Sequence, residues 1–159
     1  MRPVVQFQAV DENLLHGLSL VMRHEDRAEC YRQGYGTPIE ALRASVAASE
    51  LSFGFTIDGQ SAAVGGFRPT LLASALGYPV EGFVWVLTGD IINKHPREYM
   101  RHSKTLLSVW LAYCPLIRGT IDVNHAPALR WARWVGATLS EPVRLPPYGL
   151  PFIVWELKR

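Results

Sequence analysis

The feature that most constrains the fold is a strand–helix–strand pattern in the second half of the chain. Gly82 to Leu87 is apolar on both faces, which is typical of a central strand covered on both sides. A long helix is expected to start near Pro96 and to stop at Pro115, and Leu116 to Val123 forms the next strand. The buried face of that helix is marked at three- and four-residue steps by Met100, Ser103, Leu107, Trp110 and Cys114. Such a unit predicts two parallel strands joined by a right-handed crossover.

Two helical segments are predicted in the first third of the chain. Asp11 is a good N-cap for the first, and its helical pattern runs to Tyr31 with a break near His24. Thr37 to Glu40 opens the second with an N-cap Thr, a Pro at the first position and a Glu at the third. This helix is expected to run to about Ala48.

A β-hairpin is predicted from Leu51 to Phe67, because Asp58-Gly59 between two apolar runs is a strong signal for a tight hairpin turn. The other predicted segments are strands at Val4 to Val10 and Phe152 to Leu157, a loop with some local helix at 68–81, a short helix from about Ala126 to Val135 closed by Gly136, and an extended connection at 141–151. This order indicates a single mixed-sheet domain, α/β or α+β, that covers residues 1–159.

Composition excludes several classes of protein. The 159 residues suit one domain, and 48% hydrophobic against 19% charged residues exclude a disordered tail. The 16 basic and 14 acidic residues leave a net charge of +2, too balanced to predict nucleic-acid or membrane binding. The longest near-apolar stretch has about 13 residues, too short to span a bilayer, and no signal peptide is visible. We therefore expect a cytoplasmic protein.

Cysteine and histidine spacing predicts no metal site. Cys30 and Cys114 form no CxxC pair and are expected to be buried, reduced thiols. The five His residues show neither HExxH nor HxxxH spacing, whereas helical ligand pairs need four-residue steps.

Five groups of residues occur in order along nearly the whole chain. They are Met22-Arg23-x-x-Asp26-Arg27-x-Glu29, Phe55-Thr56-Ile57-Asp58-Gly59-Gln60, Trp85-Val86-Leu87-Thr88-Gly89, Ile121-Asp122-Val123 with Ala128 to Gly136, and Gly149-Leu150-Pro151-Phe152. With the order of elements, they resemble the GNAT acyltransferase superfamily, and most closely a branch of GNAT-like internal virion or assembly proteins coded by tailed phages. The resemblance implies a mixed, mostly antiparallel sheet of about six to seven strands, flanked by about four helices, with one parallel crossover.

The resemblance also implies where acetyl-CoA or another acyl-CoA would bind. The strand end Val86-Leu87-Thr88 would supply a backbone N–H to the oxyanion, and the loop that opens with Gly89 would hold the pyrophosphate. Five further side chains would add to this cofactor site: Lys94, Arg97, Arg101, Asn124 and His125. The basic ones would compensate for a loop that is poor in glycine.

The chain departs from the superfamily pattern in two places. Acetyl-CoA enzymes of the superfamily usually carry Arg/Gln-x-x-Gly-x-Gly/Ala after the fourth strand, whereas here only Gly89 is present. Asp90 adds a charge of the same sign as the pyrophosphate, and Pro96 removes an N–H from the helix start. On the last helix, the superfamily's frequent Tyr general acid falls on Ala132, and its usual Asn falls on His125.

Asp26 and Glu29 are the candidates for a catalytic general base. They lie three residues apart, share a helix face and continue the apolar stripe of Leu18 and Met22, where partial burial raises a carboxyl pKa. The alternative is that both carboxylates form ion pairs on a solvated face with Arg23, Arg27 or Arg32. Two further questions stay open at this point: whether His125 is a helix cap or a catalyst, and whether Tyr31 or Tyr99 acts as an acid.

Two functions of different classes follow. The first is a GNAT-type N-acyltransferase that moves an acyl group from acyl-CoA to an unknown amine. The second is a GNAT-shaped phage protein without catalysis that assembles into the virion or binds a host protein, in the host cytoplasm or the virion. The apolar final strand and the aromatic content also allow a homodimer.

Overall fold

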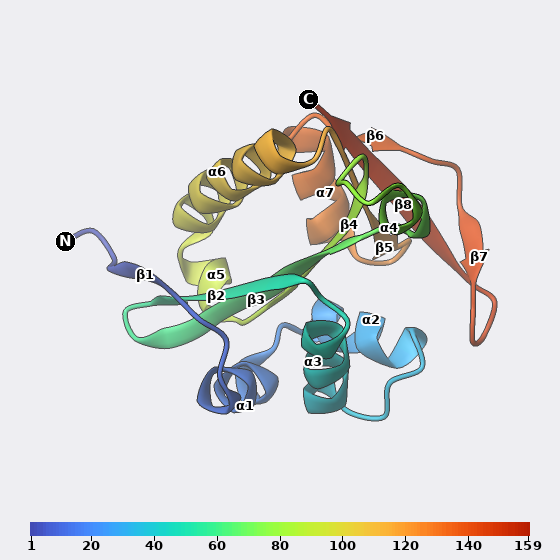
Figure 1. The fold of residues 1–159 in the computed structure, drawn as a ribbon. Helices are drawn as coiled ribbons and strands as arrows, with labels where there is room; N and C mark the ends of the chain where they lie inside the picture. The colour runs from blue at the N-terminus through green and yellow to red at the C-terminus, as the bar shows by residue number, and fades with distance from the viewer.

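The computed structural model describes residues 1–159 and contains one eight-stranded mixed sheet with helices on both faces (Figure 1). The strands are β1 (Val5–Gln8), β2 (Leu51–Ile57), β3 (Gln60–Pro69), β4 (Gly82–Thr88), β5 (Leu116–Asp122), β6 (Thr138–Leu139), β7 (Val143–Leu145) and β8 (Leu150–Lys158). Their order is β1-β2-β3-β4-β5-β8-β6, with β7 also paired to β8. All neighbouring strands are antiparallel except β4 and β5. The predicted fold class and its single parallel crossover are confirmed.

The helices form two groups. The helices that precede β4 in the chain are α1 (Glu12–Val21), α2 (His24–Arg32), α3 (Pro38–Ala47) and α4 (Leu71–Leu76). The helices that follow β4 are α5 (Ile91–Lys94), α6 (Pro96–Tyr113) and α7 (Ala126–Trp134). In Figure 1, α1, α2 and α3 lie below the sheet, whereas α6 and α7 lie above it. The count of elements exceeds the prediction because the first predicted helix is divided into α1 and α2, and because the short elements α4, α5, β6 and β7 leave little periodic pattern in the sequence.

Local signals placed the long elements correctly. The side chain of Asp11 accepts a hydrogen bond from the Leu14 N–H and caps α1, and Thr37 caps α3 in the same way. Both Asp58 and Gly59 have positive φ values, 49° and 79°, as the tight turn between β2 and β3 requires. The predicted helix break falls at Met22 and Arg23, between α1 and α2.

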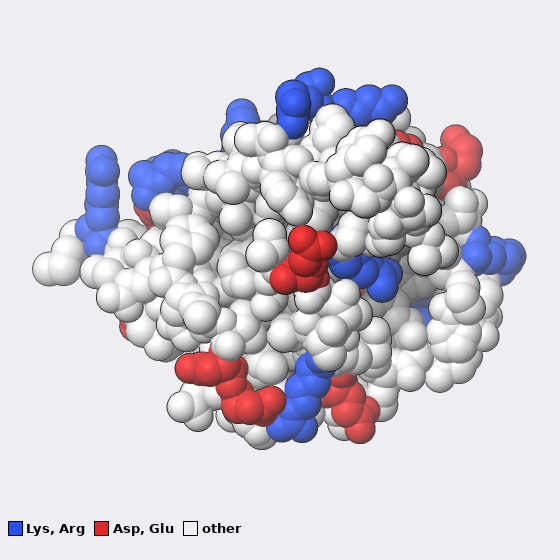
Figure 2. All heavy atoms as spheres, in the orientation of Figure 1, with Lys and Arg blue, Asp and Glu red and all other residues white.

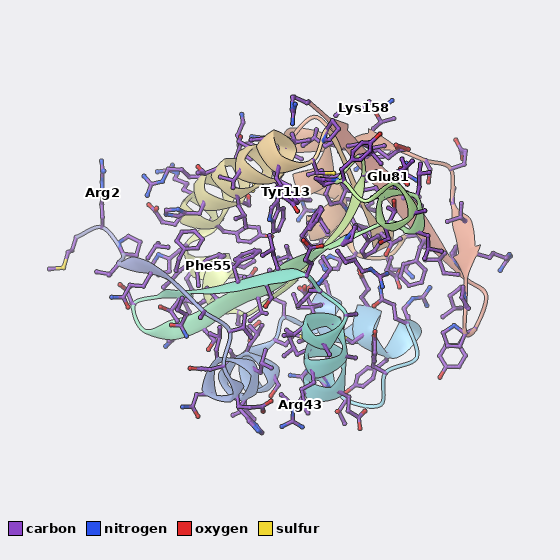
Figure 3. All side chains as sticks on the ribbon, viewed as in Figure 1. Arg2, Arg43, Phe55, Glu81, Tyr113 and Lys158 are labelled. Carbon is purple, nitrogen blue, oxygen red and sulfur yellow. The ribbon has the colours of Figure 1, made fainter.

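Each face of the sheet has its own apolar core. Below it, α1 and α3 pack on β3 through residues such as Leu18, Leu42 and Val64. Above it, α6 and α7 pack through Leu107, Trp110, Cys114, Ile117, Ala132 and Trp155. Phe55 lies between the sheet and α6, as Figure 3 shows. Of the predicted buried face of α6, Met100 and Ser103 are only half-buried.

The two free cysteines are buried, as predicted. None of the helices combines the length and the apolar character needed to cross a membrane.

The parallel strands β4 and β5 separate soon after they meet. Their register covers only Gly82 with Ile117 and Phe83 with Arg118. By contrast, β3 and β4 pair over seven positions, and so do β5 and β8. The carboxyl-terminal halves of β4 and β5 therefore do not pair with each other, and a gap opens in the middle of the sheet.

Candidate functional site

A cavity of about 610 Å³, which we call the cleft, lies where β4 and β5 separate. The ends of both strands line it, α2 lies at its inner end, and α6 and α7 enclose it from above. The sequence-predicted residues that line it are Asp26, Glu29, Val86, Thr88 and His125. Among the others, Leu87, Gly89, Lys94 and Asn124 do not line the cleft.

The inner end of the cleft holds a buried polar cluster of four residues, Arg23, Asp26, Thr88 and His125. The Thr88 hydroxyl donates to Asp26 Oδ2 at 2.8 Å, and the Thr88 N–H donates to Oδ1 at 3.2 Å. Arg23 Nε lies 3.0 Å from Asp26 Oδ2 and 2.7 Å from the Thr88 hydroxyl oxygen. His125 Nε2 lies 3.4 Å from Asp26 Oδ2. The cluster therefore ties α2 to the end of β4 and to the start of α7.

Asp26 is held as a carboxylate by this cluster. Burial acts to raise the pKa of Asp26, but the contacts with His125, Arg23 and Thr88 outweigh it and leave the pKa below its ordinary value. A carboxylate with a lowered pKa and every oxygen partnered is a weak proton acceptor, so its place favours a positioning role. The predicted ion pair with Arg23 exists, but both side chains are buried rather than solvated.

Glu29 has the opposite electrostatic character. Burial is the largest influence and raises its pKa to about 7. His125 and the Asp122 N–H act to lower this pKa, and the weaker effects of the Asp26 and Asp122 carboxylates raise it. Its Oε2 accepts a single hydrogen bond, from the Asp122 N–H at 3.1 Å. Glu29 is thus able to take up and release a proton near neutral pH, which is the property of a general base.

His125 is the N-cap of α7. Its Nδ1 accepts from the Ala128 N–H at 3.2 Å, while Nε2 faces Asp26. With Nδ1 as the acceptor, the proton of the neutral ring lies on Nε2, toward Asp26. Burial lowers the pKa of His125, but the Asp26 carboxylate raises it more, so the net direction is upward. The cap, one of the two alternatives that the sequence left open for His125, is present, whereas the contact of His125 with Asp26 had no signal in the sequence.

The loop after β4 does not form the expected backbone nest for a pyrophosphate. The Gly89 N–H donates to the Ala62 carbonyl at 2.8 Å, and the Asp90 N–H donates to the Val21 carbonyl at 2.8 Å. Downstream, the Asn93 and His95 N–H groups bond to carbonyls of the loop and of α5. These donors are therefore occupied within the protein.

Gly89 has a packing role that the sequence did not indicate. A Cβ at this position would lie 2.6 Å from the Ser61 carbonyl oxygen. The glycine therefore lets the end of β4 approach β3 closely.

Basic side chains gather at the outer end of the cleft. A second hollow of about 650 Å³ adjoins the cleft and shares Pro96, Met100 and Trp134 with it. Its charged residues, which we call the basic rim, are Arg97, Arg101 and Lys104. Arg101 pairs with Glu98, whereas Arg97 forms no ion pair. Lys94, also predicted, is exposed on α5 and lines neither cavity.

Two residues of this outer end, Lys104 and Trp134, were not among the site residues predicted from the sequence. Lys104 Nζ lies 5.2 Å from the centre of the Trp134 ring, and Trp134 is 48% exposed. A cation and an aromatic ring in contact suit a ligand that carries both phosphate and a flat ring. The three-residue step from Arg101 to Lys104 on one helix face was the available signal.

The distribution of charged side chains over the surface does not mark this site. In Figure 2 the charged side chains are dispersed over the visible face and form no broad patch of one sign. No group of three or more His, Cys, Asp or Glu side chains is placed to hold a metal ion.

Only one of the two candidate acids lies at the cleft. Tyr99 lines it from α6, and burial raises the pKa of its phenol. Tyr31 is 45% exposed and lines no part of the cleft. Ala132, where the superfamily frequently has a Tyr, is fully buried.

Solved structures share this architecture. RimL, a ribosomal L7/L12 alpha-N-protein acetyltransferase in complex with coenzyme A, is similar over 97% of this chain and 93% of its own, with TM-score 0.69 and 11% identity. A GNAT-family acetyltransferase from Bacillus anthracis matches 97% of this chain and 94% of its own, with TM-score 0.71 and 9% identity. The chain has the fold of the GNAT acetyltransferases. The ribosomal-protein-S18-alanine N-acetyltransferase from Escherichia coli has this GNAT fold as well, covering 98% and 94% of the two chains, with TM-score 0.61 and 13% identity.

No protein-family model matches the sequence, and a search of curated proteins gives no match. The likeness to GNAT enzymes is thus one of fold. The activity of this chain has to be argued from its own cleft.

Proposed function

We propose that the chain is an acyl-CoA-dependent N-acyltransferase that transfers an acyl group, most simply acetyl, to a primary amine. The observation that carries this proposal is the gap between β4 and β5, with an ionisable Glu29 at its inner end and the basic rim at its outer end. Acyl-CoA has a polyanionic nucleotide end and a reactive thioester end. The two ends of the cleft offer complementary chemistry to these two groups.

The basic rim and Trp134 fit the nucleotide end of acyl-CoA. Arg97, Arg101 and Lys104 supply side-chain donors in place of the occupied backbone N–H groups of the loop. The half-exposed Trp134 ring offers a surface for the adenine base. This arrangement puts the thioester arm in the cleft between β4 and β5.

Proton transfer to Glu29 starts the reaction. A bound ammonium gives one proton to the Glu29 carboxylate, and the freed nitrogen lone pair attacks the thioester carbonyl carbon. The new C–N bond forms and the C–S bond breaks, so that CoA leaves as a thiolate. The second proton lost by nitrogen reaches the sulfur through water.

Val86 is the residue best placed to stabilise the oxyanion. The Thr88 N–H faces the gap, where it bonds to Asp26. Since N–H directions alternate along a strand, the Val86 N–H faces the same gap two residues earlier. We therefore assign the oxyanion donor to the N–H of Val86 rather than to that of Leu87 or Thr88, the other residues of the predicted strand end.

The test is a thermal shift with acetyl-CoA. Ligand at about 100 times its Kd should raise the Tm by at least about 5 °C. Free CoA should give a similar shift, because the nucleotide end carries the charge. No shift with any acyl-CoA or with CoA would contradict the proposal.

A second candidate function is a GNAT-shaped binding protein without catalysis, and the occupied N–H groups of Gly89 and Asp90 favour it. Under this proposal the chain comes from a tailed phage and acts in virion assembly, on a host protein, or as a homodimer. Co-purification from infected cells tests it. A virion or host partner, together with no CoA binding, is the result that supports it over the enzyme.

A further inference from the structure

Another cavity, which we call the lower cavity, is separate from the cleft and from the hollow at the basic rim. It lies on the opposite face of the sheet from α6 and α7. It measures about 410 Å³ and is enclosed by α3, by β4 and β5, and by Leu145 at the end of β7 with Pro146 after it. The turn after α2 closes it at the side, where Gly34 approaches Pro147 so closely that a Cβ would lie 2.6 Å from that ring. The mechanism above leaves this space unassigned.

The lower cavity and the cleft meet at the gap between β4 and β5. Both are lined by Glu29, Val84, Trp85, Val86 and Thr120. Glu29 is the only carboxylate among these shared residues. A molecule in the lower cavity therefore reaches the same proton acceptor as an acyl group in the cleft, from the other side of the sheet.

The lining of the lower cavity is nearly free of charge. Its one carboxylate is Glu29 and its one cation is Arg68, whose guanidinium lies 4.8 Å from the centre of the Phe83 ring. Most of the remaining wall is apolar or aromatic, formed by Tyr35, Ala41, Ala44, Ala48, Trp85, Leu145 and Pro146.

The aromatic wall is held in place. Trp85 Nε1 donates to the Ser49 hydroxyl at 2.8 Å, which fixes the orientation of the indole ring. Trp85 also packs against the buried core of α1 and α3. A fixed flat wall favours ligands with a flat or branched apolar body over flexible polar chains.

We propose that the lower cavity binds the acyl acceptor, and that this acceptor is a primary amine with one positive charge on an aromatic or aliphatic body. This inference rests on the proposed function. One carboxylate pairs with one ammonium, whereas a polyamine or aminoglycoside would bury further cations without partners. An acidic acceptor would bring a carboxylate into a cavity that Glu29 lines, where the one cation, Arg68, already lies against the Phe83 ring.

The first experiment compares acceptors at a fixed acetyl-CoA concentration by the rate of thiol release. The probes are 2-phenylethylamine, isoamylamine, spermidine, kanamycin and glutamate. We expect kcat/KM for the two monoamines to exceed that for the other probes by about tenfold or more, the factor that one unpaired buried cation costs. A preference for spermidine, kanamycin or glutamate would overturn the inference.

The same amine chemistry occurs at the N-terminus of a polypeptide. A tripeptide amide that begins with Phe is therefore included as a further probe. If it is used at least as well as 2-phenylethylamine, the proposed chemistry holds and the source of the amine is a polypeptide. If it is used tenfold less well, the source is a free amine.

A pair of matched variants on α3 locates the amine. Ala44 lines the lower cavity and Ala47 does not, and both side chains are exposed. Ala44→Leu should raise the KM for 2-phenylethylamine about tenfold and leave the Kd of acetyl-CoA unchanged, whereas Ala47→Leu should change neither. Equal KM values in the two variants would place the amine elsewhere.

Direct binding keeps this inference separate from the proposed function. Saturation-transfer NMR with 2-phenylethylamine alone needs no acyl-CoA, and its signal should weaken in Ala44→Leu but not in Ala47→Leu. Acetyl-CoA binding without any amine signal or monoamine turnover would refute the inference and leave the acyltransferase proposal standing. Amine binding without acetyl-CoA binding would refute the proposed function alone.

Discussion

The two ends of the cleft are built in different ways. At the inner end, α2, β4 and α7 are joined by the buried contacts of Arg23, Asp26, Thr88 and His125. At the outer end, Arg97, Arg101 and Lys104 are exposed side chains on a single helix. The comparison teaches that the inner end is preorganised by buried contacts, whereas the charges of the outer end are exposed to water. Chemistry should therefore respond sharply to single substitutions, and binding should respond weakly to substitutions and strongly to salt.

The largest effect is expected at Glu29. Glu29→Gln keeps the shape of the side chain and removes its basicity, so kcat should fall by about 10²- to 10⁴-fold while the Kd of acetyl-CoA stays the same. Glu25→Gln, on the same helix but outside the cleft, is the matched control and should leave kcat unchanged. Steady-state kinetics with calorimetric binding checks both, and an active Glu29→Gln would remove the assigned base.

The next effect separates a positioning role from a catalytic one at Asp26. Asp26→Asn removes a buried charge while its partners Arg23 and His125 stay in place, so the loss of stability should be about 3–5 kcal/mol. For a chain of this length, this corresponds to a fall in Tm of about 10 °C. Thermal unfolding with Glu25→Gln as control measures it. An unchanged Tm would show that the cluster does not hold α2, β4 and α7 together.

A smaller effect follows from the raised pKa of Glu29. Because this pKa is about 7, kcat/KM should rise about tenfold per pH unit below pH 7 and level off above it. The stability effect has a fixed sign. Since the folded pKa lies above the ordinary value of 4.5, the contribution of Glu29 is full at low pH and is lost as the pH rises toward 7. Glu29→Gln should remove this loss, and a pH-independent rate between pH 5 and 8 would contradict the assignment.

The smallest effect is expected at the basic rim. Removing one exposed cation, as in Arg97→Ala or Lys104→Ala, should raise the Kd of acetyl-CoA by a factor of about three to ten, and this difference should shrink in high salt. Arg43→Ala is the control, because Arg43 points away from the sheet at the outer side of α3 (Figure 3). A Kd that is insensitive to salt would show that the outer end does not bind phosphates.

Much of the fold could be predicted from the sequence because its signals are local. The apolar run of β4, the turn at Asp58-Gly59 and the caps at Asp11 and Thr37 each act within a few residues. The separation of β4 and β5 could not be predicted, because strand pairing depends on contacts between distant segments. Glu29 was a candidate because of its place on a helix face, but its hydrogen-bond partner Asp122 lies 93 residues away in the chain.

The candidate cofactor site shows where sequence reasoning reaches its limit. Gly89 after a buried strand suggested a phosphate loop, but its lack of a side chain serves the close contact with Ser61. His125 showed its capping role in the sequence, but not its contact with Asp26 on another helix. The contact of Trp134 with Lys104 gave no signal, because it depends on how α6 and α7 pack.

The central claim is that the gap between β4 and β5 catalyses acyl transfer to an amine. The most direct test is the release of free thiol from acetyl-CoA by the purified protein, with and without 2-phenylethylamine, followed by mass spectrometry of the amine. Our account predicts thiol release that depends on the amine, an equal amount of the N-acetylated product, and loss of both in Glu29→Gln. Thiol release that is the same with and without any primary amine, or none at all, would contradict it.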